Sequence, residues 1–167
     1  MKKINSIALS LSLIAVGAMG MLSMTSCAPA QSAVEKAESY NRQFMSQINS
    51  VVEDYSEKLN EFSLAVSQGN VVNMTTLAQA SATITEDMKN IEASNDMEKI
   101  RDAYYDAMVA LNASLDQYVN LYSEVSALGG SAADTTTVQS GITQVQEAYD
   151  SGLQLLKDAD ELALSMN

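Results

Sequence analysis

The chain of 167 residues has no histidine, no tryptophan, one proline and one cysteine. Without histidine it lacks the commonest general base and metal ligand, and it cannot build the haem or di-iron centres that helical bundles often host. A single cysteine allows no disulfide within the chain. No conventional catalytic triad, Gly-x-Ser-x-Gly elbow or glycine-rich phosphate loop is present. We therefore expect no enzymatic activity and no cofactor.

Basic residues are also scarce, with nine Lys and Arg against 21 Asp and Glu and a formal net charge of −12. A phosphate backbone would be repelled by such a chain, so nucleic acid is excluded as a partner. Carboxylates at helical spacing can bind a divalent cation through oxygen, but no calcium-loop motif occurs. A solvated surface is the commoner explanation of the acidic groups, and we predict no metal ligands.

Proline and glycine are scarce after the first 30 residues. Pro29 is the only proline, and no glycine occurs between Gly20 and Gly69. Strands and tight turns need such residues at intervals, so this pattern indicates long helices.

The first 27 residues have the order of a secretory signal peptide. Lys2 and Lys3 precede an apolar run from Ile7 to Leu22, and small residues follow up to Cys27. Cleavage after Gly20 or Ala30 would instead leave Cys27 as a free thiol. A retained membrane anchor is a further alternative, but the 16 residues from Ile7 to Leu22 give about 24 Å of helix against roughly 30 Å of hydrocarbon.

The segment Met24-Thr25-Ser26-Cys27 resembles the lipobox of bacterial lipoproteins. Thr25 and Ser26 match the pattern, and Met24 stands where the family usually has leucine. The resemblance implies removal of residues 1–26 and attachment of acyl chains, such as palmitate, to Cys27. Ala28 replaces the aspartate that in enteric lipoproteins is associated with inner-membrane retention. This implies an outer-membrane lipoprotein that faces the periplasm.

Residues 32–167 form a single predicted domain after the signal peptide (1–26) and a lipidated tether (27–31). Counting in sevens places apolar residues on one stripe in each of four segments, at about 32–67, 71–93, 96–128 and 135–166. The links between them are short. The sequence predicts an all-α fold: an antiparallel up-down-up-down four-helix bundle preceded by a signal-peptide helix.

Several residues are expected at the helix ends. We predict caps at Ser32 (with Glu35), Asn95 and Asp134, and helix termination at Gly69-Asn70 and Gly129-Gly130. Gly141 and Gly152 fall on the apolar face of the last helix. They either let a neighbouring helix come close or only weaken the helix, each by up to about 1 kcal/mol relative to alanine.

In the predicted topology, the second turn and the C-terminus lie at the same end of the bundle as Cys27. That end carries a group of carboxylates that we call the acidic pole: Glu86, Asp87, Glu92, Asp96, Glu98, Asp102, Asp106, Asp158, Asp160 and Glu161. We expect it to tilt the bundle on the membrane, or to recruit cations or a basic protein partner. Lys89, Lys99, Arg101 and Lys157 lie among these carboxylates.

Tyrosines offer a second possible surface. Tyr40 and Tyr105 lie off the main apolar rows and are candidates for partner contact. Tyr104, Tyr118 and Tyr149 lie on the stripes, where core packing is the simpler role and a ligand cavity the alternative. The sequence thus predicts an envelope lipoprotein with a structural or protein-interaction role. The alternative is a periplasmic helical module that binds a small molecule or a cation.

Overall fold

The computed structural model describes residues 33–129 and 135–166. They form four helices, α1 (Ala33–Gln68), α2 (Thr75–Lys89), α3 (Glu98–Ala127) and α4 (Thr135–Ser165), and this part of the chain contains no strand. The predicted all-α class is confirmed. Cys27 and the signal peptide, together with the predicted caps Ser32 and Asp134, lie outside the described residues.

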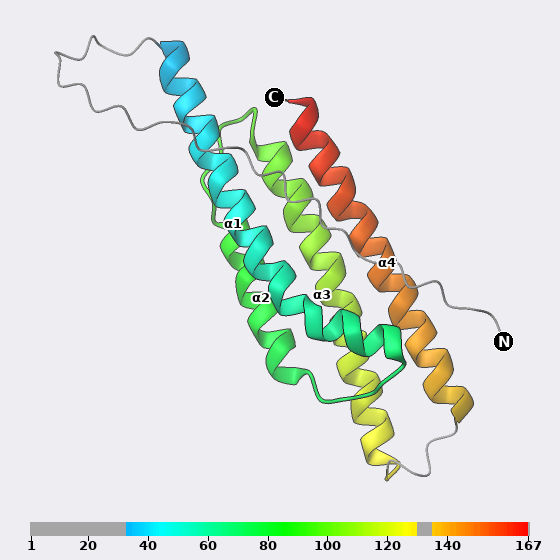
Figure 1. Ribbon diagram of the computed structural model, residues 1–167. Coiled ribbons are helices and arrows are strands. Elements are labelled where there is room, and N and C mark those ends of the chain that lie inside the picture. Colours follow the sequence, from blue (N-terminus) through cyan, green and yellow to red (C-terminus); the bar gives the residue numbers. More distant parts are fainter. Residues whose placement is uncertain (1–32, 130–134, 167) are drawn as a thin grey trace.

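The helices lie along one long axis, with α3 and α4 side by side over most of their length (Figure 1). Helix α2 lies beside α3, and α1 lies beside α2. The last turns of α1 leave that direction and cross α3 toward α4 (Figure 1). The start of α1, the connection between α2 and α3, and the end of α4 all lie at the same end of the molecule (Figure 1).

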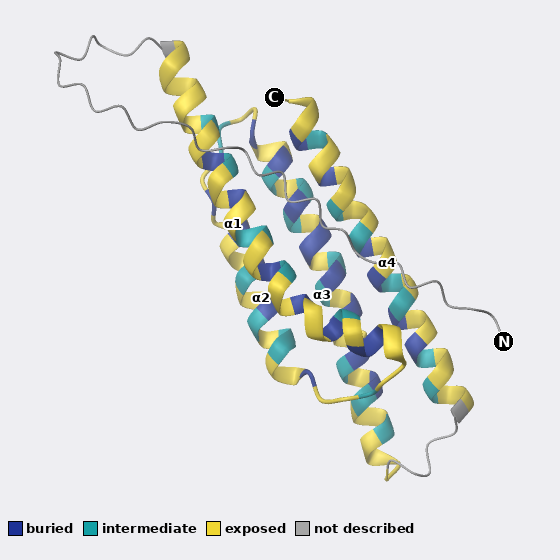
Figure 2. Ribbon diagram, in the orientation of Figure 1, coloured by how far each residue is buried: buried dark blue, intermediate teal, exposed yellow. Residues whose placement is uncertain are grey.

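The core follows the apolar rows that were counted from the sequence, and Figure 2 shows the buried residues on the facing sides of the helices. Fully or nearly fully buried members of these rows include Phe44, Ile48, Tyr55, Phe62, Met88, Ile100, Met108, Leu111, Leu115, Tyr118 and Val145. Burial of these large side chains stabilises the fold by about 1.5–3 kcal/mol each relative to exposure.

At the helix ends, members of the apolar rows are exposed. Val34 is 66% exposed at the start of α1, Leu128 is 56% exposed just past α3, and Met166 lies exposed just past α4. These residues continue the seven-residue spacing to the ends of the helices, where the side chains are exposed. Leu155 is also exposed although it lies in the middle of α4, and nothing in the structure explains its position.

Helices α3 and α4 approach closely at two glycines. A Cβ atom added to Gly152 would lie 2.7 Å from Cγ of Leu111, and one added to Gly141 would lie 2.6 Å from Cδ1 of Leu121. Both distances are far shorter than van der Waals contact. The glycines therefore allow the close approach of α4 to α3. Of the two roles that the sequence left open for Gly141 and Gly152, the structure supports close helix packing.

Aromatic contacts join the end of α1 to α3 and α4. The ring of Phe62 makes edge-to-face contacts with Tyr118 of α3 and Tyr149 of α4, at centroid distances of 5.5 and 5.3 Å. Such pairs contribute about 0.5–1.5 kcal/mol beyond the area they bury. This cluster joins the crossing turns of α1 to both neighbouring helices.

The ends of α1 and α3 match the predicted glycine stops. Gly69 has φ +66°, and the amide of Asn70 donates to the carbonyl of Ala65 at 3.0 Å, which is the Schellman arrangement. Gly129 has φ +77°, and its amide donates to the carbonyl of Ser126. A residue with a side chain would be strained at either position.

Helix α2 is shorter than the predicted segment 71–93, and the chain before it forms hydrogen bonds outside the helix. The amide of Val72 donates to the hydroxyl of Tyr118, and Asn73 accepts from the amide of Thr75 in a turn.

The predicted cap Asn95 is wrong: α3 begins after Met97 and has no side-chain cap. The carbonyl of Ser94 accepts from the amides of Met97 and Glu98 instead.

Candidate functional site

The acidic pole is the surface that the sequence singled out for function. Its carboxylates lie on the last turns of α2, the following connection, the first turns of α3 and the last turns of α4. These segments lie at the end of the molecule where α1 begins (Figure 1). All ten of these carboxylates belong to exposed residues, so the pole is a solvated surface.

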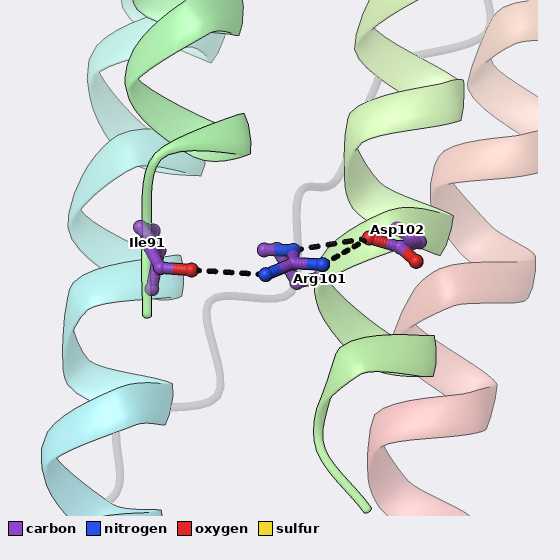
Figure 3. A network of polar contacts seen from close by, with 3 residues as sticks. All are labelled: Ile91, Arg101 and Asp102. Atoms are coloured by element: carbon purple, nitrogen blue, oxygen red, sulfur yellow. Dashed lines mark hydrogen bonds and ion pairs between the residues drawn. The ribbon is translucent and has the colours of Figure 1, made fainter. Parts of the chain in front are cut away.

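Arg101 is the half-buried cation of the acidic pole, with 21% of its side chain exposed. Figure 3 shows its guanidinium between the α2–α3 connection and Asp102. Nη1 donates to the carbonyl of Ile91 at 3.3 Å, while Nε and Nη2 donate to Oδ1 of Asp102 at 3.0 and 2.8 Å. Arg101 is thus used internally, holding the connection against α3.

The two off-row tyrosines also make contacts within the protein. The Tyr40 hydroxyl donates to the carbonyl of Glu92 at 3.2 Å, which joins α1 to the α2–α3 connection. The Lys89 ammonium lies 5.6 Å from the centre of the Tyr105 ring, at the end of α2. Both side chains remain partly exposed and lie at the acidic pole. A partner that bound there would meet aromatic edges among carboxylates.

Tyr104 joins the pole to the core. Its hydroxyl donates to Oδ1 of Asp160 at 2.6 Å, across the α3–α4 interface. Burial, followed by the hydrogen bond and the negative charge of Asp160, raises the pKa of Tyr104 well above its usual range. The phenol therefore remains protonated and works as a fixed donor to the carboxylate.

The described residues give little support for the binding of a metal or a buried ligand. No group of three or more Asp, Glu, Cys or His side chains within residues 33–129 and 135–166 is arranged to hold a metal ion. Two shallow hollows are open to solvent, one between the end of α3 and the start of α4 and one between α1 and the start of α2. Neither is lined by Tyr104, Tyr118 or Tyr149, which lie in the core.

A chain of hydrogen bonds inside the bundle was not predicted from the sequence. The Tyr55 hydroxyl lies 2.9 Å from the Met108 carbonyl and 2.8 Å from Oδ1 of Asn112, and Nδ2 of Asn112 donates to the Thr85 hydroxyl at 2.8 Å. Thr85 in turn donates to the carbonyl of Ser81 at 2.9 Å. The sequence signal for this chain is the presence of the polar residues Asn112 and Thr85 within amphipathic helices.

Burial raises the pKa of Tyr55 strongly, and the nearby Tyr149 adds to the effect. Tyr118 and Tyr149 are raised as well, mainly by burial, although the hydrogen bond from Val72 to Tyr118 and that between Ser63 and Tyr149 act in the opposite direction. Burial also raises the pKa of the Asp150 carboxyl. All four buried tyrosines therefore serve as neutral packing and hydrogen-bonding groups.

No described helix combines the length and the apolar character needed to cross a membrane. Comparison with known protein families, with curated proteins and with solved structures finds no match to this chain.

Proposed function

We propose that this chain is a bacterial envelope lipoprotein, anchored by lipid on Cys27, whose acidic and non-enzymatic bundle acts through protein contacts or as a structural element. The order of residues 1–27 supports the anchor. The proposal takes the four helices as an up-down-up-down antiparallel bundle that stands on an outer membrane and faces the periplasm. Several acyl chains would hold it stably, since each buried methylene contributes about 0.8 kcal/mol.

One structural observation carries the functional part of the proposal: the acidic pole and the start of α1 lie at the same end of the molecule (Figure 1). About five residues separate Cys27 from the first turn, which is about 17 Å when extended. Charges at that end would lie within a few Debye lengths of the lipid headgroups, since this length is about 8 Å at physiological ionic strength. The pole is therefore suited to setting the tilt of the bundle or to binding a basic protein partner.

Intact-mass analysis of the chain purified from bacterial membranes tests the anchor. We expect a mature protein that begins at Cys27 and carries acyl mass. The Cys27→Ser variant should lose that mass and leave the membrane fraction. A mature chain that begins at Met21 or Gln31 without acyl mass would contradict the proposal.

Charge reversal tests the pole. Asp96, Asp106 and Glu98 should be changed to lysine together, while Asp102 is kept because it pairs with Arg101. We expect a changed tilt on acidic liposomes or a changed set of cross-linked envelope partners. The matched control reverses Glu53, Asp116 and Glu147, three exposed carboxylates outside the pole. If both variants behave like the wild type, the pole serves only to keep the surface solvated.

A further inference from the structure

Three contacts fix the alignment of α3 with α4. They are Leu121 with Gly141, Leu111 with Gly152, and Tyr104 with Asp160. Along these contacts the residue numbers fall on α3 as they rise on α4. Because each residue advances a helix by about 1.5 Å, Ala110 is level with Leu155, and Ala103 is level with Leu162.

Ala103 and Ala110 lie on the flank of α3 that faces away from α2. The residues of α3 that contact α2 or the α2–α3 connection include Arg101, Tyr105 and Asn112. At about 100° per residue around a helix, Ala103 and Ala110 project roughly opposite to these three side chains.

Leu155 and Leu162 lie on the flank of α4 that faces away from α1. Tyr149 points toward α1, since its ring contacts Phe62. At about 100° per residue, Ala148, Leu155 and Leu162 project roughly 100–140° to one side of Tyr149.

These two flanks meet on one surface. Continued in steps of seven residues, the row on α3 leads to Glu124 and the row on α4 leads to Gly141, and both of these residues line the same hollow. We call the surface the outer edge of the α3–α4 pair. Its residues are Ala103, Ala110, Ala148, Leu155 and Leu162.

The outer edge is apolar and partly open to solvent. Leu155 is 41% exposed, and the other four residues are half-buried. Three of the five are alanines, whose small side chains let a further helix pack closely against α3 and α4. Ala148 and Leu162 are 14 residues apart, which is about 21 Å of helix. A partner helix of about four turns would cover this length.

Carboxylates border the outer edge. Asp106 of α3 and Asp158 of α4 are exposed and lie beside its two rows. The basic residues of these two helices are Lys99, Arg101 and Lys157, of which Arg101 is bonded to the α2–α3 connection. A second copy of this chain would bring like charges together on this surface. A helix with lysine or arginine beside its apolar row is complementary to it.

We propose that the outer edge docks an amphipathic helix of a partner protein, whose apolar row covers Leu155 and is flanked by lysine or arginine. This inference rests on the part of the proposed function in which the bundle acts through protein contacts, and it gives that contact a place and a chemistry. It does not depend on the lipid on Cys27. It also gives a role to the exposed Leu155 in the middle of α4.

The test uses the whole mature chain from residue 27 on, with Cys27→Ser, so that neither the lipid anchor nor tilt on a membrane enters the result. The probe is a fluorescein-labelled helical peptide of about 18 residues with leucine on one face and lysine on both sides of that face. We expect its fluorescence anisotropy to rise on binding. Leu155→Gln with Ala110→Gln should weaken binding about tenfold or more, because polar groups would lie under the apolar row of the peptide.

The matched control is Leu64→Gln with Ala82→Gln, an exposed leucine and an exposed alanine outside the outer edge, and it should leave binding unchanged. A second peptide of the same composition, with its leucines spread around the helix, should bind more weakly than the first. The proposal is wrong if the two peptides bind equally. It is also wrong if the outer-edge variant keeps its helical circular dichroism and binds like the wild type.

A charge variant covers the case in which the glutamine variant does not fold. Asp106→Asn with Asp158→Asn changes only exposed side chains and should weaken binding and reduce its dependence on salt. Asp54→Asn with Asp116→Asn removes two exposed charges away from the outer edge and should have little effect. Equal effects of the two pairs would overturn the proposal. Sedimentation of a wild-type dimer that Leu155→Gln converts to a monomer would also overturn it, since a second copy would then occupy the surface.

Discussion

Single glycines have two different roles in this protein. Gly69 and Gly129 supply a backbone with positive φ, and a Cβ atom at either would meet no other atom within 4 Å. Gly141 and Gly152 have ordinary helical backbones and are needed for space. The first role can be recognised from the end of an apolar row, whereas the second depends on which side chain lies opposite.

The two helical glycines should differ when they are changed to alanine. At Gly152 the new methyl group would lie 3.1 Å from the backbone nitrogen of Leu111 as well as near its side chain, and a helix backbone cannot easily move. At Gly141 it meets only the end of the Leu121 side chain, beside an open hollow. Overpacking costs about 1–3 kcal/mol, against a gain of up to about 1 kcal/mol in helix propensity.

We therefore expect Gly152→Ala to lower the free energy of unfolding in urea and Gly141→Ala to leave it nearly unchanged or raise it. The reverse order of the two variants would show that α3 and α4 do not approach as described.

Stability at high pH should depend on the buried tyrosines. Their pKa values are raised in the folded protein, so the unfolded chain loses these protons first as the pH rises above about 10. The free energy of unfolding is then expected to fall by about 1.4 kcal/mol per pH unit for each such tyrosine, and to show no such loss below pH 9.

Urea unfolding at several pH values between 8 and 11 measures this slope. Tyr104→Phe should make the slope above pH 10 less steep by one tyrosine's contribution. An unchanged slope in that variant would mean that Tyr104 ionises as easily when folded as when unfolded.

At the scale of the elements, a large aromatic contact joins α1 to α3 and α4. Its first turns are exposed, and its last turns reach α3 and α4 through Phe62, which is 0% exposed. The seven-residue spacing places Phe62 on the apolar stripe predicted for residues 32–67. It did not predict that the end of α1 would cross α3, because a periodic pattern gives the buried face of a helix and not its direction relative to neighbours.

Phe62→Ala should lower the free energy of unfolding by about 3–5 kcal/mol, since it removes the ring that fills the space between Tyr118 and Tyr149. Leu64→Ala is the matched control on the same helix. Leu64 is 56% exposed, and its truncation should change stability by about 0.5 kcal/mol at most. Chemical denaturation of both variants provides the comparison, and a similar loss in the two would argue against the aromatic cluster as the attachment of α1.

For the whole molecule, charge is the dominant surface property. Seven basic and 21 acidic residues remain beyond residue 26, which gives a net charge of −14. Of the ion pairs formed by described residues, Glu38–Arg42 and Lys157–Glu161 are exposed and contribute at most about 1 kcal/mol each. Repulsion between carboxylates therefore opposes the compact state.

Salt should stabilise the protein. Raising the ionic strength from about 0.01 M to 0.15 M shortens the Debye length from about 30 Å to about 8 Å and screens this repulsion. A gain of 1 kcal/mol would raise the Tm by about 2–4 °C for a chain of this size. Differential scanning calorimetry at the two salt concentrations measures the effect. The Asp96, Glu98 and Asp106 lysine variant should gain less from salt, and a Tm that falls with salt in the wild type would contradict the expectation.

The sequence by itself determined the all-α class, the buried rows of the four helices and the glycine stops at residues 69 and 129, because periodicity and backbone preference are local properties. Only the tertiary structure decided that Gly141 and Gly152 allow α3 to approach α4 closely. It also decided that Arg101 and Tyr40 hold the α2–α3 connection. The chain of hydrogen bonds through Tyr55, Asn112 and Thr85 likewise appears only in the folded structure. Each of these features joins residues that are far apart in the chain, and a hydrogen bond or a close approach exists only when the partner's position is fixed.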